Sequence, residues 1–432
     1  MKSELKERAL RVGLPREAGA AAKVSRRAAD RLRAGHLWVY RSDVDEVYPA
    51  AGETGIETGA IVSVLDGRGF PLGSAIYSDA SQIALRVVSE KTALTRAEYL
   101  EDVRERVAAA VALRREVAPE AFHLNADTSA DDACRLIFSE ADGLPGIVAD
   151  KYSGLVVLQL LTQGTAQDDV REVLRDVLAE ELELETIVER PDGRVRELEK
   201  LELPPAGALF AKNAEAPVLE TVFTINGMKF HFNAEAGQKT GAFLDQRLNY
   251  AAAAKYARGR ALDVCTYQGG FALHMAQVCD EVTGVDASRS ALQVADRNLQ
   301  LNPQLKATVE WIEADAFELL REFEAAGERF DTIVLDPPAF AKTKRAAEGA
   351  MRGYKELNLR AMKMLRPGGT LVTCSCSHHV PLAEFVEAVG SAASDAKRRV
   401  QVMETRGAAP DHPSVMTLPE TDYLKCLICR VG

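Results

Sequence analysis

The sequence predicts a multidomain α/β protein with a small N-terminal β-barrel, a central α+β domain and a C-terminal domain built on a parallel sheet. Its 432 residues exceed the length of one ordinary domain. Short apolar runs separated by turn signals fill residues 21–93, which is typical of a small all-β unit. Strands and helices alternate after about residue 243, and this alternation indicates parallel strands joined by crossover helices.

We expect four segments along the chain. They are a basic N-terminal arm at residues 1–20, the β-barrel at 21–94, the α+β domain at 95–233 and the parallel-sheet domain at 234–432. Residues 95–117 predict a helix, because apolar positions recur at helical spacing and charged pairs lie on the outer face. A second helix, "TAQDDVREVLRDVLAEEL", follows in the α+β domain, opened by a Thr or Asp cap.

Composition limits the class of protein. No run of about 18 apolar residues appears, so we expect no membrane helix, and the charged N-terminus lacks the apolar core of a secretory signal. Seven cysteines without small-domain spacing favour a reducing cytoplasm. A net charge of -11 argues against a protein that simply coats nucleic acid.

The N-terminal region is nevertheless basic. Residues 1–41 carry eleven Lys or Arg against four Asp or Glu, so this end can direct a polyanion to one face. A solvated arm explains the same charge. A helix, "SRRAADRLRAG", brings Arg26, Arg27, Arg31 and Arg33 together on the small β unit, where they suit contact with an RNA backbone. The alternative is an ordinary surface helix.

The stretch "ALDVCTYQGGFALHMA" predicts a cofactor loop, because a buried strand ends in Gly269 and Gly270 before a helix. The loop is not G-x-G-x-x-G, which disfavours a dinucleotide. The next strand ends in Asp286, suited to ribose hydroxyls, and the third leads to Asp315, suited to an adenine amino group. In this order the set fits S-adenosylmethionine. The predicted cofactor-binding residues are Asp263, Thr266, Tyr267, Gly269, Gly270, Phe271, Asp286, Ala287, Ser288, Asp315, Ala316, Phe317, Asp336 and Pro337.

The fourth strand ends in "VLDPPAFAK", which predicts the substrate edge of the pocket. Consecutive prolines fix a rigid turn that presents Asp336, Pro338 and Phe340. A carboxylate, a rigid backbone and an aromatic ring are the groups that hold a base turned out of its stack. In the alternative, the turn is structural and Phe340 packs into the core.

The stretch "TLVTCSCSHHV" ends the fifth strand beside the fourth. Cys374 and Cys376 share one face if the strand extends that far. A zinc site is disfavoured, because His378 and His379 point apart in extended chain and the two cysteines of this stretch lack C-x-x-C spacing. A buried structural thiol is the common role of Cys. A nucleophilic thiol is favoured by the proximity of Asp336.

These motifs resemble a known family. "GQKTGAFLDQR" (residues 237–247), "VCTYQGGF", "LDPPAFAK", "SCSHH" and "APDHPS" are similar to motifs of the bacterial class I RNA cytosine-C5 methyltransferases with an N-terminal PUA domain, the 23S rRNA large-subunit methyltransferase I type. "RLRAGHLWVYRSDV" resembles the start of that PUA domain, and "CRLIFSEADGLPGIVADKY" the middle domain. The resemblance implies a PUA-like barrel, a Rossmann-like domain that binds S-adenosylmethionine, and RNA as partner, either 23S rRNA or a large-subunit precursor.

The resemblance also implies a cysteine nucleophile. Carried over, the nucleophile is Cys376 in "SCS", and Cys374 is the second choice because "TCS" resembles the catalytic stretch of other RNA cytosine-C5 methyltransferases. Those enzymes carry a Pro-Cys pair after the acid, where this chain has "DPPAF", so a two-cysteine scheme is in doubt.

In the implied chemistry, the thiolate adds to C6 of cytosine and Asp336 supports the addition at N3, while His378 and water are the candidate bases for the C5 proton. Lys239, Asp245 and Arg247 are expected to order the cofactor or the RNA backbone, although Arg247 and Asp245 equally suit a helix-start salt pair. His412 is a pocket candidate that equally suits a turn between two prolines.

Two other functions remain open to the sequence. One is an amino-group methyltransferase that acts on adenine or guanine and needs no cysteine. The other is an RNA-binding PUA protein with an inactive Rossmann-like domain. The sequence also leaves a homodimer open.

Overall fold

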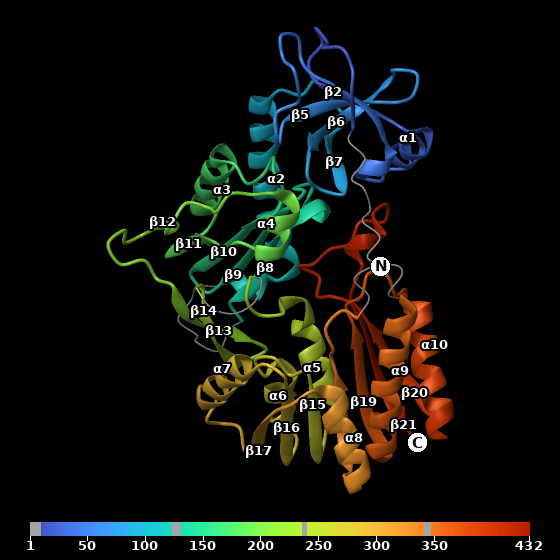
Figure 1. Ribbon diagram of the computed structural model, residues 1–432. Helices are drawn as coiled ribbons and strands as arrows, with labels where there is room; N and C mark the ends of the chain where they lie inside the picture. The colour runs from blue at the N-terminus through green and yellow to red at the C-terminus, as the bar shows by residue number, and fades with distance from the viewer. Residues whose placement is uncertain (1–9, 123–130, 236–239, 341–346) are drawn as a thin grey trace.

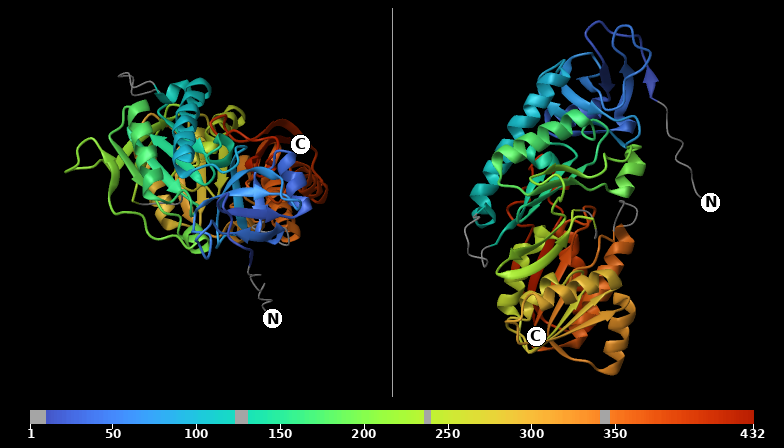
Figure 2. Two further views of the ribbon diagram at one scale, coloured as in Figure 1. Left: turned by 90° about the horizontal axis from the view of Figure 1, so that it is seen from above. Right: turned by 90° about the vertical axis from the view of Figure 1, so that its left-hand side faces the viewer.

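The computed structural model describes residues 10–122, 131–235, 240–340 and 347–432. Three parts follow one another along the long axis of the molecule: an N-terminal β-barrel, a central sheet with its helices, and a C-terminal α/β layer (Figures 1 and 2). The predicted multidomain α/β class is therefore confirmed. None of the helices in the described ranges has the length and apolar character needed to cross a membrane.

The N-terminal part is a seven-stranded sheet with the order β1-β4-β2-β5-β6-β7-β3, closed around a core that includes Val24, Val39 and Leu85. Helix α1 (Arg26–Arg33) begins where the Ser25 hydroxyl accepts a hydrogen bond from the Ala28 N–H, a standard N-cap. The strands are β1 (Arg11–Val12), β2 (Ala21–Val24), β3 (Trp38–Tyr40), β4 (Val44–Tyr48), β5 (Ile61–Leu65), β6 (Pro71–Tyr77) and β7 (Ile83–Ser89).

The central part is a five-stranded sheet with the order β12-β11-β10-β9-β8. Helix α2 (Arg96–Val117) is the helix predicted from periodicity, and Thr95 and Glu98 form its capping box. Helix α3 (Asp168–Glu181) begins after Gln167, whose side chain makes no cap bond, so the predicted Thr or Asp cap is wrong. The remaining elements are β8 (Ala133–Phe138), β9 (Ile147–Tyr152), β10 (Leu155–Leu160), β11 (Thr186–Glu189), α4 (Gly193–Glu199) and β12 (Ala208–Ala211).

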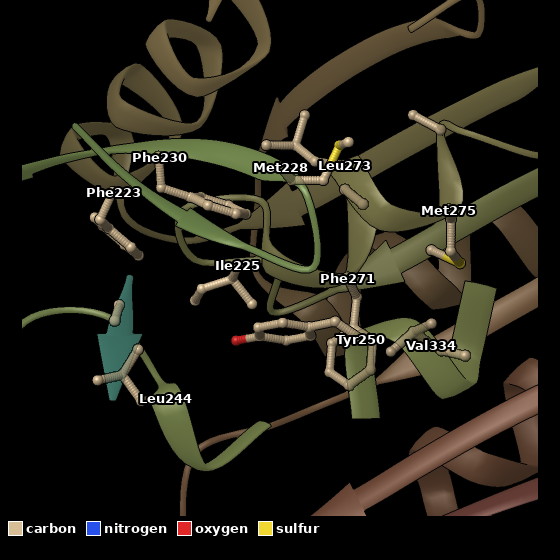
Figure 3. Close-up of a cluster of buried hydrophobic side chains, with 14 of the residues drawn as sticks. Phe223, Ile225, Met228, Phe230, Leu244, Tyr250, Phe271, Leu273, Met275 and Val334 are labelled. Carbon is tan, nitrogen blue, oxygen red and sulfur yellow. The ribbon is translucent and has the colours of Figure 1, made fainter. Parts of the chain in front are cut away.

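A hairpin of β13 (Glu220–Ile225) and β14 (Met228–Asn233) joins the central sheet to the C-terminal part. Its Phe232 ring stacks on Tyr152 of β9, with ring centroids 4.0 Å apart. On the C-terminal side its Phe230 belongs to the same buried cluster as Tyr250 and Phe271 (Figure 3). One aromatic core therefore spans both parts and resists movement between them, because interiors pack at near-crystalline density.

The C-terminal part is a seven-stranded sheet with the order β17-β16-β15-β18-β19-β21-β20. Strands β15 to β19 are parallel, and β21 runs antiparallel between β19 and β20. The order reverses between β15 and β18, and the crevice at such a reversal is the usual ligand site of open α/β sheets. The strands are β15 (Arg260–Val264), β16 (Glu281–Asp286), β17 (Thr308–Glu313), β18 (Phe330–Leu335), β19 (Leu365–Ser375), β20 (Val400–Arg406) and β21 (Lys425–Val431).

Helices cover both faces of this sheet, as expected for parallel strands (Figure 1). Tyr250 of α5 and Leu273 of α6 belong to the buried cluster on one face, while Leu320 of α8, Tyr354 of α9 and Phe385 of α10 belong to the cluster on the other. The helices are α5 (Arg247–Tyr256), α6 (Gly270–Met275), α7 (Arg289–Gln300), α8 (Ala316–Ala326), α9 (Ala347–Met364) and α10 (Leu382–Ala396).

The segment between β20 and β21 is tied to the central part by a buried carboxylate, that of Asp411. It accepts a hydrogen bond from the Arg135 backbone N–H at 2.9 Å and pairs with Arg247 Nε at 3.4 Å, while its own backbone carbonyl accepts from the Arg114 guanidinium at 2.9 Å. Burial alone would raise the pKa of Asp411, but the charges of His412 and Arg247 hold it below its usual range. The charged carboxylate is thus stable in the interior only with these partners.

We predict that Asp411→Ala lowers the free energy of unfolding by about 3–5 kcal/mol, because it leaves the buried guanidinium of Arg247 without its main partner. Urea unfolding followed by circular dichroism measures the change. The control is Glu281→Gln, which removes an exposed pair with Arg260 and should change stability by at most about 1 kcal/mol. If both variants lost the same free energy of unfolding, Asp411 would stabilise the fold no more than an exposed ion pair does, which would contradict this prediction.

Candidate functional site

The loop after β15 has an unusual backbone. Cys265, Tyr267 and Gly269 adopt left-handed conformations, with φ angles of 65°, 51° and 86°. Non-glycine residues rarely hold this conformation unless their surroundings impose it, and such residues cluster at ligand sites. Gly270 is also required for packing, because a Cβ there would lie 2.5 Å from the Tyr250 ring. The aromatic core below the loop therefore fixes its shape.

Asp263 supports the loop from beneath. Its buried carboxylate accepts hydrogen bonds from the Thr266 hydroxyl at 2.5 Å and from the Ala272 N–H at 2.9 Å. Burial raises its pKa to about 7. In the structure, both hydrogen bonds of Asp263 are to residues of the protein. Asp263 would therefore act on a cofactor indirectly, by holding Thr266 and the rest of the loop in place.

Two strand-end carboxylates line the edge beside this loop. Asp286 accepts hydrogen bonds from the backbone N–H groups of Tyr267 and Ser288, one on each oxygen, at 2.9 and 2.8 Å. Asp315 caps α8 through one oxygen only, which accepts from the N–H groups of Phe317 and Glu318. Each carboxylate oxygen can accept more than one hydrogen bond, so both groups retain capacity for a ligand.

The arrangement fits S-adenosylmethionine. Asp286 can accept from ribose hydroxyls, Asp315 can accept from the adenine amino group, and Gly269 lets the backbone approach the ligand closely. An open pocket adjoins the loop, and its lining includes Tyr267, Gly270 and Asp336. The predicted residues Ala287, Ser288, Ala316 and Phe317 all lie at the same strand ends, directly after Asp286 or Asp315.

Asp336 follows β18 and faces this cavity. Its carboxylate accepts a hydrogen bond from the Gln246 side-chain amide at 3.0 Å. Burial, followed by the nearby charges of Asp245 and Asp263, raises the pKa of Asp336 to about 8. The carboxyl group is therefore largely protonated at neutral pH and can donate a hydrogen bond, as an ordinary Asp cannot.

The proline turn that follows Asp336 contacts the thiol of Cys376. The Cys376 sulfur lies 3.9 Å from the carbonyl oxygen of Pro337, while Pro338 is exposed. Phe340 packs its ring against Tyr354, with centroids 4.9 Å apart, and against Phe317 at 5.9 Å. Phe340 is thus half-buried against α9. One part of its ring packs as the structural alternative expects, and the exposed part can still serve as the predicted aromatic platform.

The two cysteines of "TCSCS" lie in different environments. Strand β19 ends at Ser375, so Cys376 is the first residue beyond it and is partly exposed. Cys374 has 0% exposure and lies opposite Cys426 of β21, where burial, followed by Cys426, raises its pKa well above the ordinary value. A thiol that stays protonated in the core is a poor nucleophile, so the geometry favours Cys376.

A tyrosine holds the turn that carries Cys376. The Ser375 hydroxyl donates to the Tyr354 hydroxyl at 2.8 Å, and the Tyr354 and Ser377 hydroxyls share a hydrogen bond of 2.9 Å. All three hydroxyls are buried. Cys376 is therefore fixed between two serines that are both anchored to α9.

Other predicted residues lie away from this edge. Arg26 on α1 is 95% exposed on the barrel, Arg27 and Arg33 pair with Asp43 and Asp66, and Arg31 donates to the Trp38 carbonyl. These arginines form one exposed basic helix, and the alternative of an ordinary surface helix fits the same contacts. Lys239 lies outside the described residues.

Arg247 and His412 differ from their predicted roles. The Arg247 guanidinium is 3% exposed and bonded to Asp411 and Glu120, so it has no open face for RNA in this structure. The His412 ring is buried against Phe138 and bonded to Asp411. Both residues instead tie the C-terminal part to the central part.

Several residues that support the site could not be predicted from the sequence. Tyr354 lies on α9, while Tyr423 and Lys425 lie at the start of β21 or just before it. The Tyr423 hydroxyl donates to Asp245 at 2.5 Å, and Gln246 bonds Asp336. Gln246 alone had a detectable signal, because it stands inside the motif "GQKTGAFLDQR".

Comparison with known families agrees with this geometry. The pattern of the family described as S-adenosylmethionine-dependent methyltransferase matches residues 142–428, and that of the PUA-like domain matches residues 22–90. The chain belongs to the S-adenosylmethionine-dependent methyltransferases. The predicted cofactor, the PUA-like barrel and the Rossmann-like domain are thereby confirmed.

Relatives of this methyltransferase match it along most of its length. It is 39% identical over 402 residues to "Ribosomal RNA large subunit methyltransferase I" of Shewanella amazonensis, covering 92% of this chain and 95% of the relative. It is 37% identical over 410 residues to the protein of the same name from Photobacterium profundum, covering 93% and 96%. A solved structure of a protein assigned as a methyltransferase, complexed with SAH, shares the fold with a TM-score of 0.75 at 17% identity, covering 94% of this chain and 99% of that one.

Proposed function

We propose that this methyltransferase transfers a methyl group to C5 of a cytosine in RNA, with 23S rRNA or its precursor as substrate, through a covalent bond from Cys376 to C6. The observation that carries the proposal is the partly exposed Cys376 thiol, 3.9 Å from the carbonyl of Pro337, the residue that follows Asp336. Support for the RNA comes from relatives named as ribosomal RNA large subunit methyltransferase I.

The chemistry requires a nucleophile because C5 of cytosine is otherwise unreactive. The Cys376 thiolate adds to C6, which breaks the C5–C6 double bond and makes C5 electron-rich. The neutral carboxyl of Asp336 donates a hydrogen bond to N3, where negative charge develops during the addition. S-adenosylmethionine supplies the methyl group on an electrophilic sulfonium. C5 takes this methyl group, and loss of the C5 proton then restores the double bond as the thiolate leaves.

His378 is the candidate base of this chain for the C5 proton. It stands two residues after Cys376, and its ring packs on Tyr423 with centroids 5.3 Å apart. Although the residue keeps solvent contact, loss of hydration lowers its pKa, so the imidazole is largely neutral at neutral pH and can accept a proton. A water molecule at the open side of the pocket is the alternative acceptor.

RNA contact is expected on the barrel and near the pocket. The exposed Arg26, Arg27 and Arg33 on α1 offer charge to a phosphate backbone without reading sequence. Phe340, half-exposed beside Asp336, offers a ring face against which a base that has left its stack can pack.

We predict that Cys376→Ala abolishes formation of 5-methylcytidine, because the addition to C6 has no nucleophile. Cys374→Ala is the matched control: it removes a buried thiol from the core and should reduce stability while leaving measurable methylation. Purified protein, labelled S-adenosylmethionine and unmodified 23S rRNA are incubated, and the digested nucleosides are separated by mass spectrometry. A methylated purine that survives both substitutions would overturn the proposal in favour of amino-group methylation.

We predict that the methylation rate falls as pH rises through about 8, because Asp336 then loses the proton that it donates to N3. Its pKa is raised, so the active neutral form exists below this value and is lost above it. Asp336→Asn should lower the rate by about 10²-fold or more, as for removal of an acid–base group. Asp245→Asn removes a charge that raises the pKa of Asp336, so it should move the alkaline limit to lower pH. Single-turnover rates measured across pH check this prediction. If the rate of Asp245→Asn falls at the same alkaline pH as that of the unaltered protein, the role of a protonated Asp336 is contradicted.

A further inference from the structure

A buried lysine lies beside the turn that carries Cys376. Lys425 is the first residue of β21, and its Cα pairs with that of Ser375 at the end of β19. Its ammonium donates to the Ser377 carbonyl at 2.8 Å and to the Tyr423 carbonyl at 2.7 Å. The residue is only 7% exposed. Two of its three N–H groups thus fix the backbone on either side of the site, and the third can serve another acceptor.

Burying an ammonium is costly unless an opposite charge lies close to it. Among the described residues, Lys425 makes hydrogen bonds to carbonyls but no ion pair with a carboxylate. Burial holds the pKa of Lys425 below the ordinary value of a lysine, and the negative charge of Cys376, followed by that of Asp422, offsets part of this effect. Burial lowers the pKa of His378 and the ammonium adds to that effect, while the charge of Cys376 also acts on the hydroxyls of Tyr354 and Tyr423. The thiolate of Cys376 is therefore the main counter-charge that this position offers.

We propose that Lys425 is a positioning residue for Cys376: its ammonium fixes the turn after β19 and holds a positive charge beside the thiol, which favours the thiolate. This inference rests on the proposed function, in which that thiolate is the nucleophile. A neighbouring Lys, Arg or protonated His is a recognised way of making a cysteine reactive near neutral pH.

Lys425 and Tyr354 hold the same turn by different means. Tyr354, from α9, bonds the Ser375 and Ser377 hydroxyls and is uncharged. Lys425, from β21, bonds the Ser377 carbonyl and is charged. Loss of either loosens the turn, but only loss of Lys425 removes charge from the neighbourhood of the thiol. Comparison of the two variants therefore separates position from electrostatics.

The test is the pH dependence of Cys376 alkylation by iodoacetamide in the full-length protein, followed by peptide mass spectrometry that distinguishes Cys376 from Cys374. In Lys425→Met we expect the midpoint of the pH dependence of Cys376 alkylation to rise by at least about one pH unit. At a pH below the midpoints of both the unaltered protein and the variant, the variant is then alkylated about tenfold more slowly. Lys425→Arg should retain most of the effect. Tyr354→Phe should change the rate without moving the midpoint, and Lys363→Met, on the exposed end of α9, should change neither.

Lys425→Gln is a second neutral variant, since its amide can still donate to the Ser377 carbonyl. The proposal is overturned if either neutral variant, with wild-type melting temperature and affinity for S-adenosylmethionine, keeps the wild-type midpoint. It is also overturned if the thiol of Cys376 in the unaltered protein has a pKa at or above about 8.5, the value of an ordinary cysteine. This measurement does not depend on the folding of any variant. The alkylation experiment requires no RNA, so it tests the effect of Lys425 on the thiol independently of methyl transfer. The proposed function fails in a different experiment, if methylation survives Cys376→Ala.

Discussion

The buried carboxylate of Asp411 joins parts of the chain that lie far apart in sequence. It binds the Arg135 backbone on β8 and the Arg247 side chain on α5, and both contacts hold the segment between β20 and β21 in place. Tyr423 lies near the end of that segment and contacts Asp245, and Lys425, which begins β21, contacts the turn of Cys376. Buried charges tolerate little displacement of their partners. The geometry of the Cys376 turn therefore depends on an ion pair located outside the pocket.

An aromatic core supplies the second constraint. The rings of the β13–β14 hairpin pack between the central sheet and the helices below the cofactor loop (Figure 3). Tyr250 leaves no room for a side chain at position 270. Left-handed residues in the loop, among them Tyr267, are held by this packing and by Asp286. The cofactor edge and the substrate edge of the pocket are thus supported by different interactions, one apolar and one ionic.

Local patterns were enough to predict the sheet and much of the site. Alternation of strands and helices predicts β15 to β19, and strand ends locate Asp286, Asp315, Asp336 and Cys376, because the carboxyl ends of parallel strands share one edge. Contacts between distant segments could not be predicted this way. Arg247 and Asp411 are separated by 164 positions, so no local pattern distinguishes a buried ion pair from an RNA contact. Tyr354 and Lys425 reach the Cys376 turn only through the packing of α9 and the pairing of β21. The role of Lys239 stays a prediction.

The central claim is that Cys376 forms a covalent bond to cytosine, and trapping that bond tests it most directly. In RNA containing 5-fluorocytidine, C5 carries fluorine in place of the proton that must leave, so the thiol cannot be released after methyl transfer. The account predicts an adduct that survives denaturation, forms only with S-adenosylmethionine present, and maps to the peptide residue Cys376. An adduct at Cys374, or formation of 5-methylcytidine in ordinary RNA without any adduct in the fluorinated RNA, would contradict it.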